Sequence, residues 1–79
     1  MDQQLFDRFV KCAVDVLSVD AAQVKPEAKF NEDLDADSLD LVELVMALEE
    51  EFGIEVPESE LEGVDTVGKA FALVSAKAG

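Results

Sequence analysis

The sequence contains no histidine, tryptophan or tyrosine and only one cysteine, Cys12, among its 79 residues. A single cysteine excludes an internal disulfide and a zinc site built on cysteines. Without histidine, and with no placement of basic residues that argues for an activated thiol, no nucleophile and base can be paired. These absences predict a protein that is not an enzyme, in which Cys12 is a small hydrophobic residue near the core.

Basic residues are scarce: the chain has 6 of them against 19 acidic residues, for a formal net charge of -13. No lysine or arginine lies between Lys29 and Lys69, whereas 14 of the 19 acidic residues do. Such a surface repels nucleic acid phosphates and anionic membranes and attracts basic protein surfaces. The charge therefore predicts protein partners with basic patches, no nucleic acid and no insertion into a membrane.

Long apolar runs and a signal peptide are also missing, so we expect a cytoplasmic protein. The hydrophobic residues, 49% of the chain, recur at helical spacings, and the length suits one small domain, residues 1–79. The pattern predicts an all-α fold with three longer helices, one short helix and a long first loop. The expected helices are 3–17, 38 or 39 to 52, 58–62 and 67–77, with the loop over 18–37.

The second of these helices has two apolar faces when it is placed on a wheel of 100° per residue. One face is predicted to join the core, and it holds Leu41, Leu44, Val45, Leu48 and Phe52. The other is predicted to face solvent, and it holds Leu39, Val42 and Met46 among Asp40, Glu43, Glu49 and Glu50. Stray exposed apolar residues are common, but three together within a charged rim favour a protein-docking surface.

Ser38 stands where an acidic run meets this helix. Asp33, Asp35 and Asp37 open like a calcium-binding EF-hand loop, but the positions that need Gly and Glu hold Ser38 and Leu44. We therefore expect no metal site. Two interpretations remain open: Asp37 or Ser38 caps the helix, or the Ser38 hydroxyl is an attachment point for an anion at the helix start.

Segment 33–57 reads DLDADSLDLVELVMALEEEFGIEVP and resembles the acyl carrier protein family. The resemblance is carried by Asp37-Ser38-Leu39, then Val42-Glu43 and Glu49-Glu50-Glu51-Phe52, and length and acidity extend it over nearly the whole chain. It implies a four-helix bundle in which Ser38, flanked by Asp37 and Leu39, carries 4'-phosphopantetheine from coenzyme A. The arm would hold acyl chains as thioesters. Partners would be a phosphopantetheinyl transferase and fatty acid synthesis enzymes, docked on Asp40, Glu43, Met46, Glu49 and Glu50.

The resemblance also implies that the acyl chain can retreat between the helices. Candidate lining residues, each equally explained as ordinary core, are Phe30, Leu44, Leu48, Val56, Leu61, Val64 and Ala70. Many bacterial members have Gly where this chain has Asp35, which argues against an unusual backbone conformation there.

We expect a free-standing monomer of the bacterial type II fatty acid synthesis type. A carrier from a dissociated polyketide pathway, or a peptidyl or D-alanyl carrier, is the alternative.

Overall fold

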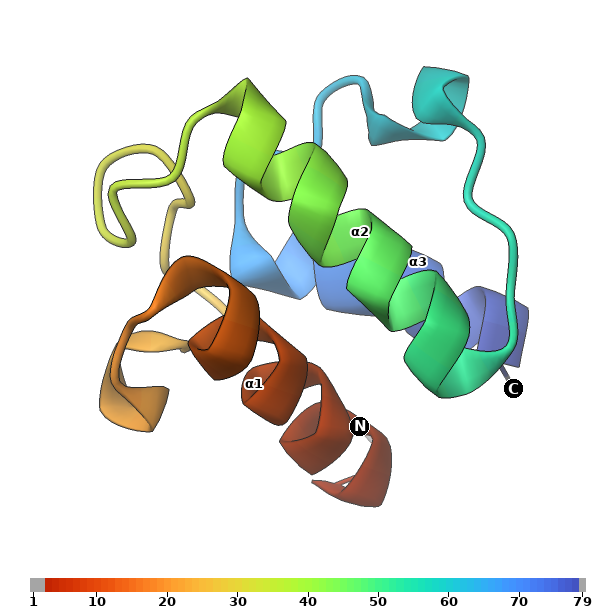
Figure 1. Ribbon diagram of the computed structural model, residues 1–79, viewed down its shortest axis with the longest axis horizontal. Helices are drawn as coiled ribbons and strands as arrows, with labels where there is room; N and C mark the ends of the chain where they lie inside the picture. Colours follow the sequence, from red (N-terminus) through yellow and green to blue (C-terminus); the bar gives the residue numbers. More distant parts are fainter. Residues whose placement is uncertain (1–2, 79) are drawn as a thin grey trace.

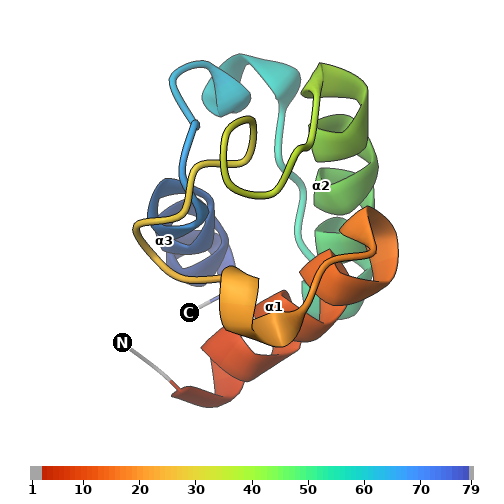
Figure 2. The same ribbon diagram turned by 90° about the vertical axis from the view of Figure 1, so that its left-hand side faces the viewer.

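The computed structural model describes residues 3–78 and shows three α-helices joined by two long connections. The α-helices are α1 (Gln3–Leu17), α2 (Ser38–Phe52) and α3 (Val67–Ala78). Two single turns of 3-10 helix lie in the connections, η1 (Ala21–Gln23) and η2 (Glu58–Leu61). Figures 1 and 2 show the three helices around one centre, with α1 alongside α2. The all-α prediction is confirmed.

The predicted short helix over 58–62 is a 3-10 turn that ends one residue earlier, at Leu61. Pro57 precedes it in an extended conformation, and Glu60 N donates to the Pro57 carbonyl, three residues back, at 2.9 Å. Gly63 then turns the chain with φ +80°. A segment this short gives too few backbone bonds to repay the ordering of an α-helix, so the fourth element of the bundle is a turn.

The core is formed by one face of each α-helix together with apolar residues of the first connection. Phe9 and Phe71 stack edge to face with ring centroids 5.8 Å apart, and Phe6 meets Phe71 in the same way at 5.1 Å. Val24, Phe30 and Leu34, three apolar residues of the first connection, are buried. The buried cluster comprises Phe9, Ala13, Val24, Ala28, Phe30, Leu34, Ala36, Leu44, Leu48, Val67, Ala70, Phe71 and Val74.

The first connection, residues 18–37, is bonded to the start of α3 (Figure 2). Val67 N donates to the Ala28 carbonyl at 2.9 Å, and Gly68 N donates to the Pro26 carbonyl at 2.8 Å. A single antiparallel bridge joins Lys29 to Thr66, and the described residues contain no strand. The connection therefore satisfies backbone donors that the first turn of a helix leaves without partners.

Arg8 fastens α1 to the end of α2. Its Nε lies 2.8 Å from Glu51 Oε2, another of its nitrogens donates to the Glu51 carbonyl, and its guanidinium lies 4.6 Å from the Phe52 ring centroid. Gly53 then ends α2 in the left-handed region, at φ +64°, where glycine carries no steric penalty. These contacts fix where α2 ends, and so they fix how the face that begins at Ser38 is presented.

Candidate functional site

The start of α2 is capped by Asp37. Asp40 N donates to Asp37 Oδ1 at 2.9 Å, and Asp37 N donates to Asp40 Oδ2 at 3.3 Å, which makes a reciprocal capping box. Of the two residues expected as possible caps, Asp37 has this role, and Ser38 is the first helical residue. Ser38 is exposed, so a partner can reach it.

The backbone around Ser38 favours an anion. Asp37 takes two of the first donors of α2, since its side chain accepts from Asp40 N and its carbonyl accepts from Leu41 N at 3.0 Å. The N–H groups of Ser38 and Leu39 have no acceptor within the helix, because they lie in its first turn. The positive end of the helix dipole adds to their field. A phosphate on the Ser38 oxygen would lie beside these donors.

Two grooves meet at Ser38, and Leu41 borders both of them. One, of about 440 Å³, lies between the start of α2 and η2, and its walls include Val42, Glu58 and Leu61. The other, of about 200 Å³, lies toward the first connection and the segment before α3. A group attached to Ser38 would therefore have space on either side of Leu41.

The smaller groove is bordered by Phe30, Ala36, Val64 and Asp65. Lys69 hydrogen-bonds the Asp65 carboxylate, with Nζ 3.0 Å from Oδ1, and this bond keeps the pKa of Asp65 below its usual value. The smaller groove therefore has a charged carboxylate at its edge, beside apolar side chains.

The outer face of α2 exposes the three apolar residues that the helical wheel placed there. Leu39 is 66% exposed, Val42 39% and Met46 60%, and these are the large hydrophobic residues exposed in the described chain. Glu43 and Glu50 are exposed beside them, whereas Asp40 is half-buried and belongs to the capping box. The predicted apolar patch with an acidic rim is present.

A groove of about 580 Å³ continues this face at the C-terminal half of α2. Its walls hold the predicted Glu43, Met46, Glu49 and Glu50 together with three residues that sequence reasoning missed, Ala47, Ile54 and Glu55. Ile54 and Glu55 follow the turn at Gly53, which folds them back against α2. The wheel could not include them because they lie beyond the helix.

Glu49 differs from its neighbours in the acidic rim. It is half-buried, and its Oε2 accepts a hydrogen bond from Val56 N at 2.8 Å. Its carboxylate thus links α2 to the segment that leads into η2. Of the adjacent glutamates, Glu50 is exposed and Glu51 pairs with Arg8.

The seven candidate lining residues for an acyl chain do not share one cavity. Phe30, Leu44, Leu48 and Ala70 belong to the buried cluster, and Val64 packs against it. Phe30 and Val64 border the smaller groove beside Ser38. Val56 and Leu61 border a different cavity, of about 150 Å³, which lies between α2 and η2 and is also lined by Val42, Val45 and Met46.

Asp35 adopts a left-handed backbone conformation, with φ +53°. The inference that an aspartate here argues against unusual backbone geometry is therefore wrong. Its neighbours explain the turn: Leu34 and Ala36 are both buried, and Ala36 N donates to the Phe30 carbonyl at 2.8 Å. The chain must reverse between two anchored residues, and aspartate is among the residues that tolerate this region best.

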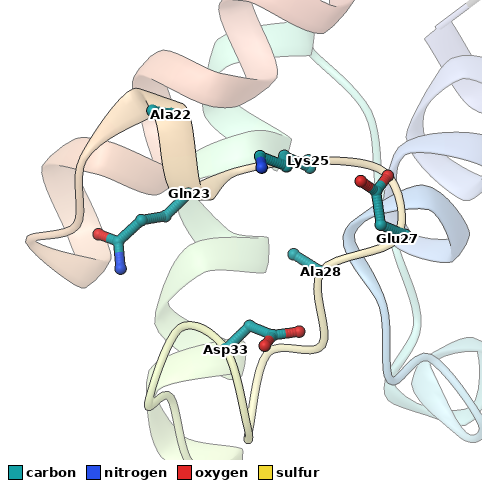
Figure 3. Close-up of a pocket in the computed structure, with 6 residues that line it drawn as sticks. All are labelled: Ala22, Gln23, Lys25, Glu27, Ala28 and Asp33. Atoms are coloured by element: carbon teal, nitrogen blue, oxygen red, sulfur yellow. The ribbon is translucent and has the colours of Figure 1, made fainter.

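A further cavity, of about 370 Å³, lies in the first connection, away from Ser38. Figure 3 shows the polar ends of Gln23, Lys25, Glu27 and Asp33 spread around it without converging on one point. The Asp33 carboxylate already accepts a hydrogen bond from Lys29 N at 2.8 Å. This cavity offers no convergent set of ligands.

Metal, thiol and membrane features add nothing to this site. Within residues 3–78 no group of three or more metal-ligating side chains is arranged to hold an ion. Burial, followed by the charges of Glu51 and Asp15, raises the pKa of the half-buried Cys12 thiol. In the described part of the chain no helix is long and apolar enough to cross a membrane.

Comparison with known proteins agrees with this geometry. The sequence family described as the phosphopantetheine attachment site matches residues 7–74. The acyl carrier protein of Picosynechococcus sp. is 52% identical over 79 residues, which cover 100% of this chain and 98% of the relative. The acyl carrier protein of Helicobacter hepaticus is 55% identical over 71 residues, which cover 90% of this chain and 93% of the relative. The chain therefore belongs to the acyl carrier proteins, which hold acyl chains on covalent 4'-phosphopantetheine and are not themselves enzymes.

Proposed function

We propose that Ser38 is the residue that carries 4'-phosphopantetheine, and that the protein serves fatty acid synthesis. The main support is that Ser38 is exposed at the start of α2, where Asp37 caps the helix. The matched range 7–74 contains three serines, Ser18, Ser38 and Ser59, and only Ser38 begins an α-helix. The bound group supplies a terminal thiol that holds the acyl chain as a thioester.

The residues around Ser38 fit such a group. The N–H groups of Ser38 and Leu39 face an added phosphodiester, and the helix dipole favours its charge. Asp37 keeps the helix start in place through its bond with Asp40. The arm is long and flexible, and the groove toward η2 gives it a surface beside its attachment point.

Docking is the second part of the proposal. Basic patches on the phosphopantetheinyl transferase and on fatty acid synthesis enzymes would meet the outer face of α2. The contact residues are Asp40, Glu43, Met46, Glu49 and Glu50, with Leu39 nearby. The exposed apolar centre and acidic rim support this, since interfaces commonly combine an apolar centre with a polar edge.

The cargo would lodge in apolar space next to Ser38. Support comes from the two grooves that meet at Ser38 and from the cavity between α2 and η2. The proposed lining is Phe30, Leu44, Leu48, Val56, Leu61, Val64 and Ala70. We further propose that residues 1–79 act as one domain and that the protein is a monomer in the cytoplasm.

The attachment site is tested by loading with coenzyme A and a phosphopantetheinyl transferase, followed by intact mass spectrometry. Wild-type protein should gain the mass of one phosphopantetheine group, and Ser38→Ala should gain none. Ser59→Ala is the matched control, because Ser59 is also exposed and borders the same groove. A mass gain in Ser38→Ala would refute the proposal, and so would its loss in Ser59→Ala alone.

A further inference from the structure

Asp35 is the one carboxylate in the acidic run ending at Asp37 that has no partner within the described part of the chain. Glu32 Oε2 lies 3.6 Å from Lys29 Nζ, and Asp33 Oδ2 accepts from Lys29 N at 2.8 Å. Asp37 caps α2 through its side chain. Asp35 is exposed, and among the described residues no hydrogen bond or ion pair engages its carboxylate. It is therefore free to pair with a cation from another molecule.

The chain holds Asp35 in a fixed place. Its two neighbours, Leu34 and Ala36, are buried, with 3% and 4% of their surfaces exposed. Ala36 N also donates to the Phe30 carbonyl at 2.8 Å. Asp35 thus stands at the exposed tip of a turn with both sides anchored in the core. A contact made by such a residue loses little freedom on binding, which favours affinity.

The backbone conformation of Asp35 is costly for an aspartate. Its φ of +53° lies in the left-handed region, which glycine adopts without a steric penalty. The side chain does not recover this cost inside the molecule, because it is exposed and, within residues 3–78, unpaired. Strain of this kind clusters at functional sites. Together with the free carboxylate, it indicates that the side chain acts on a partner.

The position relative to Ser38 selects the kind of partner. Asp35 lies three residues before Ser38, so it is outside α2 and outside the acidic rim on the outer face of that helix. Figure 1 shows this part of the first connection as a loop that runs into the start of α2. An enzyme that modifies the Ser38 oxygen must enclose the helix start, whereas an enzyme that acts on the thiol meets the far end of a long arm. A phosphopantetheinyl transferase must therefore cover the residues just before α2.

We propose that Asp35 is a specificity-determining residue for loading, and that its carboxylate pairs with a lysine or arginine of the phosphopantetheinyl transferase. The transferase then contacts the protein at two places, through Asp35 on the connection and through the outer face of α2. A correctly placed charge pair at the edge of an interface speeds formation of the right complex. The carboxylate thus adds selectivity for the transferase at a position where glycine would give the more stable fold. The inference rests on the attachment at Ser38 proposed above.

The test measures initial rates of loading by a purified transferase with coenzyme A, over a range of apo-protein concentrations. Asp35→Gly should raise the KM for the protein about threefold to fivefold at low salt, as expected for an exposed pair, and leave kcat unchanged. Asp35→Asn should give the same rise, because the charge and not the backbone makes the contact. The difference should vanish at about 0.5 M salt, where exposed charges are screened.

Two further variants separate this contact from other effects. Asp35→Lys should raise the KM by about tenfold or more, since like charges then meet. Glu27→Gln removes one negative charge from an exposed site elsewhere on the same connection, and it should leave the KM within about 1.5-fold of wild type. Urea denaturation of Asp35→Gly should show no loss of stability, so unfolding does not account for its higher KM.

Wild-type KM values for both Asp35→Gly and Asp35→Asn would overturn the inference and leave loading of Ser38 intact. So would an equal rise for Glu27→Gln, which would assign the effect to total charge. A fall in kcat at unchanged KM would also contradict it, because a docking contact acts before the chemical step. If wild-type protein gains no mass at Ser38, the proposed attachment fails and this inference fails with it.

Discussion

Asp35 shows how a single residue can store strain next to a functional site. The left-handed backbone conformation costs an L-residue about 1–2 kcal/mol of stability, and it costs aspartate less than most residues. Asp35 adopts φ +53° three residues before Ser38, and it is exposed, so no burial compensates for its conformation. Its neighbours Leu34 and Ala36 are buried and hold the turn in place.

Replacing Asp35 by glycine should stabilise the protein. Relief of left-handed strain is about 1 kcal/mol, and the greater freedom of glycine in the unfolded chain offsets about 0.5 kcal/mol of it. We therefore expect the free energy of unfolding to rise by about 0.5 kcal/mol, measured by urea denaturation. Asp35→Asn removes the same charge and keeps a tolerant side chain. Equal gains in both variants would attribute the effect to charge and not to the backbone.

Ser38 illustrates the limit of sequence reasoning at a site. The pattern around it predicts a helix start and a cap but leaves open whether Asp37 or Ser38 supplies the cap. That choice depends on the geometry of the side chains, which the spacing of residues in the sequence does not determine. The reciprocal bonds between Asp37 and Asp40 decide it. The same limit applies to Glu49, whose bond to Val56 could not be inferred from its place in an acidic run.

The α-helices follow closely from the sequence because each has both a helical period and end signals. The starts predicted at residues 3 and 67 match α1 and α3, and the predicted end at Phe52 matches α2. η1, by contrast, lies inside the predicted loop, since three residues show no period. The wheel is only partly right for Leu41 and Phe52, which are half-buried because they lie at the two ends of α2.

Gly68 permits the contact between the first connection and α3, a role that could not be inferred from its low helix propensity. From the sequence, Gly68 only weakens the first turn of its helix. In the structure a Cβ on Gly68 would lie 2.8 Å from the Pro26 carbonyl oxygen. That same oxygen accepts from Gly68 N at 2.8 Å. The glycine thus permits the close approach that joins the two segments.

Gly68→Ala should therefore destabilise the protein, although alanine is the better helix former. The gain in propensity is about 1 kcal/mol, whereas forcing the loop away costs about 1–3 kcal/mol. Thermal unfolding should show a lower Tm than wild type. Ala72→Gly, at an exposed site of α3, measures the ordinary difference between the two residues in this helix. A higher Tm for Gly68→Ala would show that the loop at Pro26 can move away from the new methyl group at little cost.

The charge of the whole molecule is distributed to leave one face without cations. The six basic residues lie outside the 30–68 stretch, and the ion pairs of Arg8, Lys29, Lys69 and Lys77 involve acids away from the outer face of α2. A net charge of -13 therefore acts most strongly where Glu43 and Glu50 are exposed. Fields of this kind raise the rate at which oppositely charged partners meet.

Reversing charge on this face should slow phosphopantetheine loading with the fold retained. Glu43→Lys combined with Glu50→Lys should lower the loading rate at low salt by about tenfold or more, since steering depends on complementary charge. Asp15→Lys with Glu27→Lys makes the same change in net charge at exposed sites elsewhere. Loading kinetics and circular dichroism of both pairs provide the measurement. Equal slowing by the two pairs would mean that total charge matters and that this face does not.

Attachment at Ser38 is best examined by fragmenting the loaded wild-type protein and locating the added mass. We predict one phosphopantetheine group on the fragment that contains Ser38, and unmodified fragments that contain Ser18 or Ser59. Added mass on either of those serines, or no added mass after incubation with transferase and coenzyme A, would show that the start of α2 is a capped helix end and not the attachment site.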